Sequence, residues 1–412
     1  MEHYLVLPRI EVCICSQILK DNGHVVNMLD MKIYQYKVSE YAGLVKEYSP
    51  DIVCIDDDPE THCNSKKLIK ITRSVFGDNV KICLRGELAS FIPDVIMQRN
   101  PELDYIIRYD DDYALLNIVN AMKNKDDFSG IYNIAYRDGN DYYVTERRAS
   151  EYELDSLPMP DRKLYPIDKY LARDSETIVK SSRGCPGKCL FCIKTKFANF
   201  KLFSMRRFVD EIESLLKIGF KSFFFADDTF AFSDKRLKEF YDEVNSRKLR
   251  FKWTSNIRIR DINEYKLKLM KEIGAYRVFV GIETINSSTS SVINKNITEE
   301  MIREKVELLH KYDMEFHASF ILGNPGDTVE DIENTIEFVK EIKPTLVTFN
   351  LIRVYPGLEL YDRSDEYGMI MKDRYWYEKD EWASKVVMGT KQLPCDVLEK
   401  LSRRCLFEFI NM

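Results

Sequence analysis

Three cysteines lie close together near the middle of the chain, Cys185, Cys189 and Cys192, in a loop that also contains Gly184 and Gly187. Their CxxxCxxC spacing allows three thiolates to gather around one corner of a metal cluster. Four Cys thiolates would complete the ligand set of a 4Fe–4S cluster. Three therefore leave one iron open, and the loop indicates a cluster that also binds a small-molecule ligand.

Zinc and disulfide chemistry are the alternative explanations of these cysteines. A structural zinc site takes four ligands, commonly in two pairs, but residues 195–280 contain neither Cys nor His. A disulfide loop would suit a secreted protein, whereas residues 1–8 lack the basic and apolar stretches of a signal peptide. We therefore favour the cluster.

Strands and helices alternate from about residue 176, and the cysteine loop follows the first of these strands. The expected strands are Thr177–Lys180, Lys221–Ala226, Lys252–Asn256, Arg277–Ile282, Glu315–Leu322 and Leu346–Ile352. The expected helices between them are Arg207–Ile218, Lys235–Arg247, Glu264–Ile273, Thr298–Tyr312 and Val329–Ile342. This pattern predicts a partial parallel (β/α)6 barrel of the TIM type, with the cysteine loop at the carboxyl ends of its strands, where such barrels bind ligands.

The first 125 residues also alternate, which predicts an α/β domain with a doubly wound, Rossmann-like parallel sheet. Its expected strands are Tyr4–Leu7, Val25–Leu29, Asp51–Ile55, Val80–Leu84 and Leu103–Ile107. Its expected helices are Val12–Lys20, Val38–Tyr48, Ser65–Phe76, Pro93–Arg99 and Tyr113–Met122. After it, Ile131–Tyr136 and Tyr142–Glu146 flank Asp138-Gly139, a turn pair that predicts a β-hairpin.

The expected domains are a Rossmann-like domain (1–130), a hairpin and linker (131–175), the barrel (176–360) and a small C-terminal helical cap (361–412). The net charge of −6 argues against a nucleic-acid partner. No apolar run approaches the ~20 residues of a membrane span. Ten Cys without a secretion signal favour a reducing, cytoplasmic location.

The cysteine run, with Phe191 directly before the third Cys, resembles the signature of the radical S-adenosylmethionine (SAM) superfamily. The resemblance implies that SAM chelates the open iron of a 4Fe–4S cluster. It also implies that an electron from the cluster cleaves SAM to methionine and a 5′-deoxyadenosyl radical, which takes a hydrogen atom from a small-molecule substrate. A flavodoxin- or ferredoxin-type protein is the implied electron donor. The first domain resembles the cobalamin-binding domain that precedes the barrel in some of these enzymes.

Five further stretches resemble the SAM-binding segments of the superfamily: Phe223–Phe230, Trp253–Asp261, Gly281–Thr284, Gly323–Thr328 and Tyr355–Gly357. The resemblance assigns to the cofactor Phe191, Asp227, Asp228, Arg258, Gly281, Glu283, Gly323, Pro325, Gly326 and Tyr355. Carboxylates suit the amino group and ribose of SAM, a cation suits its carboxylate, and glycines let the backbone approach adenine.

His317 and Tyr355 are the candidate catalytic residues. His317 is suited to donate or accept a proton on the substrate, and Tyr355 to relay a proton or a radical. Both also have structural alternatives, His317 as a histidine at the edge of the core and Tyr355 as a packing residue. Arg258 has one as well, since it could bridge a surface carboxylate.

The first domain departs from its cobalamin-binding relatives at the strand ends, where acidic residues replace small ones. The departing stretches are Asp56–Glu60, Arg85–Glu87 and Tyr109–Asp112. Acidic side chains there should obstruct a corrin, so we expect a radical SAM enzyme that works without cobalamin. The alternatives are a cobalamin-dependent radical SAM methyltransferase, a scaffold subunit without turnover, and a methylthiotransferase whose second cluster would draw on Cys13, Cys15, Cys54, Cys63 and Cys83.

Overall fold

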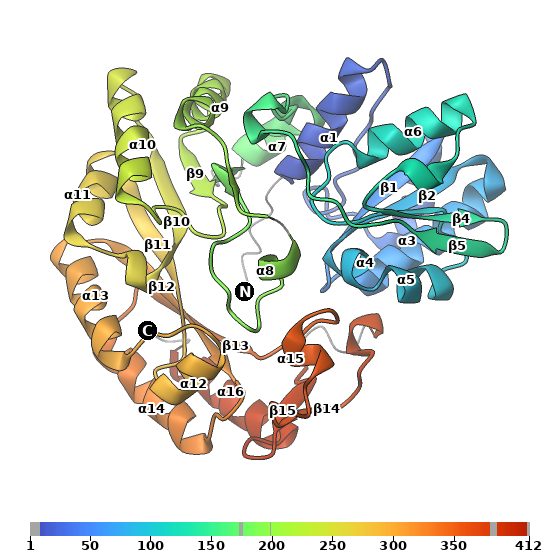
Figure 1. The fold of residues 1–412 in the computed structure, drawn as a ribbon. Coiled ribbons are helices and arrows are strands. Elements are labelled where there is room, and N and C mark those ends of the chain that lie inside the picture. Colours follow the sequence, from blue (N-terminus) through green and yellow to red (C-terminus); the bar gives the residue numbers. More distant parts are fainter. Residues whose placement is uncertain (1–8, 173–175, 198, 380–384, 410–412) are drawn as a thin grey trace. The chain divides into compact units, whose positions relative to one another are not determined.

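The computed structural model describes residues 9–172, 176–197, 199–379 and 385–409 (Figure 1). The chain divides into two compact units, with a boundary between residues 175 and 176. Residues 377–379 return to the first unit, and the other described residues after 175 form the second. In the part of the chain that the structure describes, no helix is long and apolar enough to cross a lipid bilayer.

The first unit contains a five-stranded sheet in the order β1-β2-β3-β4-β5. Its strands are β1 (Ile52–Asp57), β2 (Lys81–Gly86), β3 (Tyr105–Ile107), β4 (Ile134–Asp138) and β5 (Asp141–Val144). β1, β2 and β3 are parallel, whereas β4 and β5 pair antiparallel. The predicted hairpin is confirmed, and Gly139 at its turn has a φ of 59°, a value that favours glycine.

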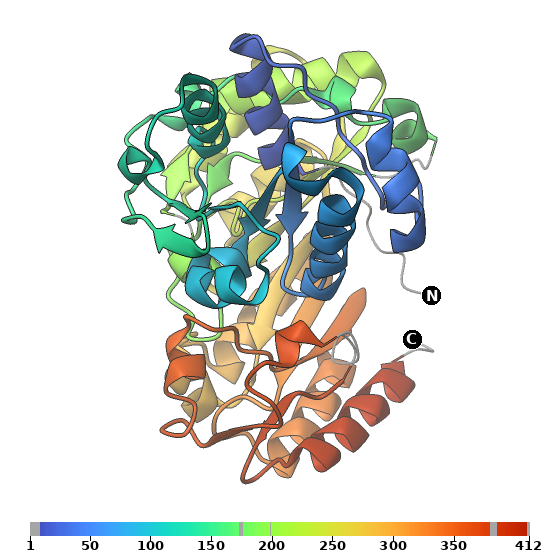
Figure 2. The same cartoon turned by 90° about the vertical axis from the view of Figure 1, so that its right-hand side faces the viewer.

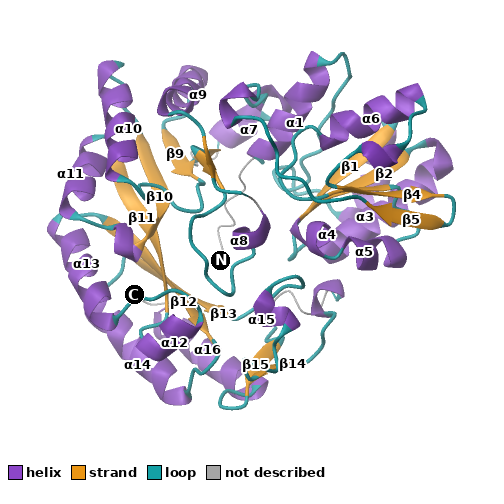
Figure 3. Cartoon of the chain, in the orientation of Figure 1, coloured by secondary structure: helices purple, strands orange, loops and turns teal. Residues whose placement is uncertain are grey.

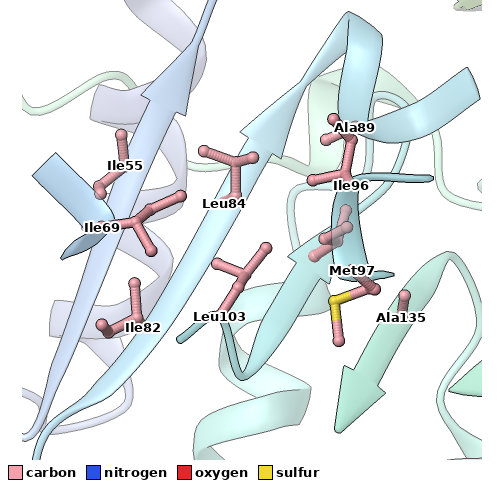
Figure 4. Close-up of a cluster of buried hydrophobic side chains, with 10 residues drawn as sticks. Ile55, Ile69, Ile82, Leu84, Ala89, Ile96, Met97, Leu103 and Ala135 are labelled. Atoms are coloured by element: carbon pink, nitrogen blue, oxygen red, sulfur yellow. The ribbon is translucent and has the colours of Figure 1, made fainter. Parts of the chain in front are cut away.

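Helices pack on this sheet through an aliphatic core, shown in Figure 4. Ile82 and Leu84 lie at alternate positions of β2 and are fully buried, together with Ile69 from α3 and Met97 from α5. The helices of the unit are α1 (Ile10–Asp21), α2 (Tyr41–Lys46), α3 (His62–Phe76), α4 (Glu87–Phe91), α5 (Pro93–Arg99), α6 (Ala114–Asn124) and α7 (Ile167–Leu171). This core fixes the parallel strands whose carboxyl ends carry the charged residues discussed below.

One predicted strand of the first unit is wrong, and a second lies outside the described residues. Val25–Leu29 is irregular, and Val25 is 92% exposed. A strand persists only when it pairs with a neighbour and buries one face, and within the described residues none pairs with this segment. Tyr4–Leu7 is the strand outside the described range.

The second unit contains a six-stranded sheet in the order β13-β12-β11-β10-β9-β6, and all neighbours are parallel. Its strands are β6 (Thr177–Val179), β9 (Ser222–Phe225), β10 (Lys252–Arg258), β11 (Ala275–Glu283), β12 (Glu315–Leu322) and β13 (Leu346–Leu351). The curved sheet lies inside an arc of helices (Figures 1 and 3). The predicted partial barrel is therefore confirmed.

The helices of this arc begin at capping residues. Each follows a Ser, Thr or Asn whose side chain accepts a hydrogen bond from a backbone N–H of the first turn, as helix N-caps commonly do. The caps are Ser204, Ser233, Asn263, Thr298 and Thr328. The helices are α9 (Met205–Ile218), α10 (Asp234–Ser246), α11 (Glu264–Glu272), α13 (Glu299–Lys311) and α14 (Val329–Ile342).

The two faces of the barrel sheet differ in burial, as β12 illustrates. Phe316, Ala318, Phe320 and Leu322 are buried on the outer, helix-covered face. The residues between them alternate to the inner face and are less buried. The inner face therefore presents the side chains that a bound ligand can contact.

The last helix, α16 (Cys395–Phe409), completes the outer layer. Leu398 and Leu401 of α16 pack with Ile332 and Ile336 of α14 and with Leu322 of β12. Figure 2 shows the red helix α16 beside the orange helix α14. The region 361–412, which was expected to form a helical cap, therefore contains a helix, and this helix lies against the edge strand β13.

Candidate functional site

The cysteine loop is held at both of its ends. β7 (Ser182–Arg183) precedes the three cysteines and pairs antiparallel with β8 (Lys201–Leu202), which follows them. Inside the loop, the Leu190 N–H donates to the Ile293 carbonyl at 3.0 Å and the Gly187 N–H points to the Cys185 sulfur at 3.3 Å. The cysteine loop is therefore fixed at its two ends and by hydrogen bonds within it.

The three thiols lie in one another's electrostatic field and are free of disulfides. Burial raises the pKa of each thiol, that of Cys192 to about 11. Such thiols stay protonated near neutral pH unless a bound metal cation favours the thiolate. Three Cys thiols in one loop are the donor set that an iron–sulfur cluster takes.

The geometry suits a cluster better than a single ion. Among the described residues, no three His, Cys, Asp or Glu side chains converge closely enough to hold one metal ion. In a 4Fe–4S cluster each cysteine ligates a different iron, so its ligands need not converge on one point. Zinc would require that convergence.

The structure gives Asp227 and Asp228 different surroundings. The Asp227 carboxylate is buried and accepts hydrogen bonds from the Ser181 N–H at 3.1 Å, the Ser181 hydroxyl at 2.8 Å and the Ser182 hydroxyl. It thereby ties the end of β9 to the chain that leads into the cysteine loop. Asp228 instead lies in the electrostatic field of Cys185 and Cys192. Of the two aspartates, Asp228 is therefore the better candidate to contact SAM.

Glu283 ends β11 in an unusual backbone conformation, with a φ of 70°. Left-handed backbone at a non-glycine residue is strained, and such strain gathers at functional sites. The Glu283 carboxylate lies 3.2 Å from the Lys295 ammonium, and the two side chains are 11% and 12% exposed. Lys295 and Glu283 both contribute to the electrostatic field at Cys189, so this ion pair lies beside the cysteine loop.

Lys295 is a site residue that the sequence analysis did not identify. It lies between Asn294 and Asn296, which have φ values of 58° and 52°. In the sequence, the run Asn294-Lys295-Asn296 indicates a tight turn, because Asn tolerates left-handed backbone. This run was the signal from which the turn could have been predicted. Arg260 donates to the carbonyl oxygens of Lys295 and Asn296 and so holds the turn in place.

Gly281 has a steric role in this ion pair. A Cβ at Gly281 would come within 2.2 Å of the Glu283 Oε1 and 3.2 Å of the Lys295 Nζ. The glycine that was predicted to contact SAM therefore makes room for the folded-back carboxylate.

Arg258 is paired with a carboxylate of its own. Its Nε and Nη2 donate to the two oxygens of Asp261 at 2.6 and 3.1 Å, a bidentate geometry that orients the guanidinium. Arg258 also contributes to the field at Cys185 and Cys189. Arg258 therefore bridges a carboxylate, as the structural alternative expected, but Asp261 is only 11% exposed rather than a surface residue. The guanidinium still lies near the thiols.

The two glycines in the turn after β12, Gly323 and Gly326, have different surroundings. Gly323 packs under α16, since a Cβ there would come within 2.7 Å of Leu398. Gly326 has a φ of 89°, and the atom nearest to its would-be Cβ is Thr289 Oγ1 at 3.9 Å. Pro325 between them is buried. Only Gly326 therefore leaves the space that a ligand requires.

His317 lies on the inner face of β12, opposite Phe279 in the register, whereas Ser319 is opposite Gly281. Its Nε2 lies 3.2 Å from the Thr348 hydroxyl, while Nδ1 is buried and has no hydrogen-bond partner among the described residues. Burial, and then the positive charge of Arg277, lower the pKa of His317. The imidazole is therefore neutral at neutral pH, about 7 Å along the strand from the level of Gly281.

The remaining candidates, Phe191 and Tyr355, are placed less informatively. Phe191 is half-buried in the cysteine loop. Tyr355 follows β13, and its ring centroid lies 5.2 Å from that of Trp376, which agrees with the packing alternative.

Comparison with known proteins identifies the barrel. Residues 179–339 match the family model described as "Radical SAM superfamily". The chain is 27% identical over 390 residues to the uncharacterized methyltransferase PH0819 of Pyrococcus horikoshii, which covers 94% of this chain and 84% of that protein. It is 25% identical to the anaerobic magnesium-protoporphyrin IX monomethyl ester cyclase of Cereibacter sphaeroides, over 84% of this chain but only 58% of the cyclase.

Two groups of solved structures share the fold over most of the chain. The radical SAM methyltransferase TsrM from Kitasatospora setae, solved with cobalamin and a [4Fe-4S] cluster, matches with a TM-score of 0.73 and 16% identity, over 89% of this chain and 74% of that one. The cobalamin-dependent radical enzyme OxsB, with aqua-cobalamin bound, matches with a TM-score of 0.79 and 16% identity, over 98% of this chain and 65% of that one. At these identities the likeness concerns the fold alone.

Proposed function

We propose that the chain is a radical SAM enzyme, because residues 179–339 match the model of that superfamily, and that it holds a 4Fe–4S cluster on Cys185, Cys189 and Cys192. When bound, the cluster supplies the electron that cleaves SAM into methionine and a hydrogen-abstracting 5′-deoxyadenosyl radical. The observation that carries this proposal is the anchored loop after the first barrel strand, in which three half-buried thiols lie in one another's electrostatic field. The substrate class is a small molecule.

We assign SAM binding to the charged residues beside the loop. The methionyl end of SAM is a zwitterion, so it needs an acceptor for its ammonium group and a cation for its carboxylate. Glu283 and Lys295 are such a pair, 3.2 Å apart and mostly buried. Arg258 is the second candidate cation, and Asp228, Gly326, Phe191 and Tyr355 are candidates for the ribose and adenine end.

We further propose that the reaction proceeds without cobalamin, because the first unit does not fit a corrin well. At the carboxyl ends of β1 and β2, Asp56 lies 3.3 Å from Arg9 and 3.4 Å from Arg85, and Arg9 also pairs with Asp58. Burial raises the pKa of Asp56. There is also no free space beside the Gly86 backbone, since a Cβ there would come within 2.3 Å of the Asp57 carbonyl oxygen. A wide, flat macrocycle would have to displace this network.

The outcome of hydrogen abstraction would then be dehydration, dehydrogenation, epimerisation or rearrangement, as in specialised metabolism. Cobalamin-dependent radical methylation is the second candidate, because the relative that covers 94% of this chain is described as a methyltransferase. A methylthiotransferase needs a second cluster, but Cys54 and Cys83 of the first unit lie within the paired strands β1 and β2, where a free Cys commonly serves as a small packing residue.

The experiment is anaerobic reconstitution with iron, sulfide and excess hydroxocobalamin, followed by desalting. We expect about four iron atoms per chain, no retained cobalt, and 5′-deoxyadenosine formation from SAM under dithionite. Cys189→Ala should abolish 5′-deoxyadenosine formation. About one cobalt per chain would favour methylation, about eight irons would favour two clusters, and the absence of SAM cleavage would overturn the radical mechanism.

A further inference from the structure

A stretch without acidic residues surrounds the cysteine loop. Between Thr177 and Val209, here called the basic segment, the sequence has eight Lys and Arg and no Asp or Glu, although the whole chain has a net charge of −6. The eight are Lys180, Arg183, Lys188, Lys194, Lys196, Lys201, Arg206 and Arg207. A run of one sign in a chain of the opposite sign creates a local positive potential.

The structure places part of this charge on the cysteine loop and on the segments that flank it. Arg183 and Lys201 lie opposite each other in the β7–β8 ladder, which closes the cysteine loop. Lys188, between Cys185 and Cys189, is exposed, as are Lys196 in α8 (Lys194–Phe197) and Arg206 in the first turn of α9. The loop that carries the three half-buried thiols therefore also carries an exposed ammonium group, and further exposed cations follow it.

We propose that the basic segment is the docking surface for an acidic one-electron carrier protein of the flavodoxin or ferredoxin class. This rests on the proposed function, which consumes one electron for each SAM molecule cleaved. One electron leaves the carrier, which is thereby oxidised, and the cluster is reduced by one. Encounters between redox proteins use small interfaces and depend on opposite charges for speed and orientation. A short exposed basic loop next to the electron acceptor meets both requirements.

An anionic substrate is the other ligand that a positive surface could attract. Substrates of barrel enzymes bind at the carboxyl ends of the strands, in sites that remove most of the ligand from water. Lys188 and Arg206 are instead exposed, and neither lies on a strand of the barrel sheet. Their exposure favours a protein partner over a small molecule.

The test uses the reconstituted full chain and a flavodoxin of net negative charge. Lys188→Glu/Arg206→Glu should raise the dissociation constant for oxidised flavodoxin by about tenfold or more and flatten its salt dependence. Reduction by reduced flavodoxin, followed as loss of cluster absorbance, should slow by a similar factor, whereas reduction by dithionite should not. An EPR-monitored potential titration separates slower docking from an altered cluster. If the double variant loses its cluster, the single variant Arg206→Glu is used for the same measurements, because Arg206 lies outside the cysteine loop.

The matched control is Lys235→Glu/Lys268→Glu, which makes the same change of charge at exposed positions of α10 and α11. The control should bind flavodoxin like the wild type. The proposal is overturned if both double variants are impaired equally, since overall charge alone would then act, or if neither is impaired. Loss of substrate turnover under dithionite, with SAM cleavage intact, would assign the segment to an anionic substrate instead. If wild-type protein fails to cleave SAM, the proposed function falls, while the titration with oxidised flavodoxin still tests docking.

Discussion

Glu283, Lys295 and Gly281 form one unit at the residue scale. The carboxylate folds back over Gly281, where a side chain would collide with it, and meets an ammonium group twelve residues later in the chain. Opposite charges that are about nine-tenths buried are stable only as a pair, because removing one leaves the other without solvation. This mutual dependence allows a sharp test of their role.

Lys295→Met leaves the Glu283 carboxylate buried without its cation, and we expect the free energy of unfolding to fall by about 3–5 kcal/mol. Lys295→Met/Glu283→Gln removes the uncompensated charge and should recover most of that loss in urea denaturation. The dissociation constant for SAM should stay raised in both variants, because both charges are proposed to bind the zwitterion. A double variant that binds SAM like the wild type would remove the pair from the cofactor site.

At the element scale, the turn after β12 contains a buried acid. Asp327 is 3% exposed and accepts hydrogen bonds from the Asn324 N–H at 2.9 Å and the Asn324 side chain at 3.2 Å. Burial raises the pKa of Asp327 to about 7. The folded protein therefore keeps this proton over a pH range in which the unfolded chain has lost it.

Asp327 should make stability fall as pH rises from about 4 to about 7, because the folded state binds the extra proton over that window. Asp327→Asn keeps the shape and an acceptor oxygen, so its stability should depend less on pH. We expect the variant to have a higher melting temperature than the wild type at pH 8 and little advantage at pH 4. Equal pH profiles for the two proteins would contradict a protonated Asp327.

The helix α16 supports the same turn from outside. Leu398 is fully buried and comes within 2.7 Å of the position that a Cβ on Gly323 would take, whereas Leu406 of the same helix is 54% exposed. Leu398→Ala should therefore cost about 2–5 kcal/mol through the cavity it leaves. Leu406→Ala, the control, should change stability by less than about 0.5 kcal/mol. Thermal unfolding of the two variants compares them, and equal melting temperatures would mean that α16 does not support the barrel.

At the scale of the whole molecule, the chain has two cores. The first unit buries an aliphatic cluster between its sheet and helices, and the second buries the outer face of the barrel sheet under α14 and α16. The boundary between residues 175 and 176 falls directly before β6. The cluster cysteines and the proposed SAM residues all belong to the second unit.

The fragment 176–412 should therefore fold and bind about four irons, because its core and ligands lie within it. It should also form some 5′-deoxyadenosine from SAM under dithionite. Circular dichroism, iron content and product analysis check this expectation. An unfolded fragment would show that the barrel depends on the first unit for stability, and a folded one without iron would mean that the first unit supplies part of the cluster site.

The sequence by itself determined the barrel and nearly all of its elements, and it supplied the cysteine spacing on which the proposed cluster rests. Cysteine spacing, apolar periodicity and capping residues act over a few neighbouring positions, so they can be read without knowing the fold. β12 and α14 begin and end where the pattern predicted. The prediction of a strand at Val25–Leu29 was wrong. An apolar pattern shows that a segment can form a strand, but it does not show whether a neighbouring strand is present to pair with it.

Only the tertiary structure decided how neighbouring candidates differ. In the folded chain, the Asp227 carboxylate accepts hydrogen bonds from the hydroxyls of Ser181 and Ser182. Gly323 packs against Leu398, and Lys295 forms an ion pair with Glu283. These outcomes depend on which strands adjoin and on single left-handed residues in turns. Neither leaves a periodic trace in the sequence, because each arises from contacts between residues that packing, rather than chain proximity, brings together.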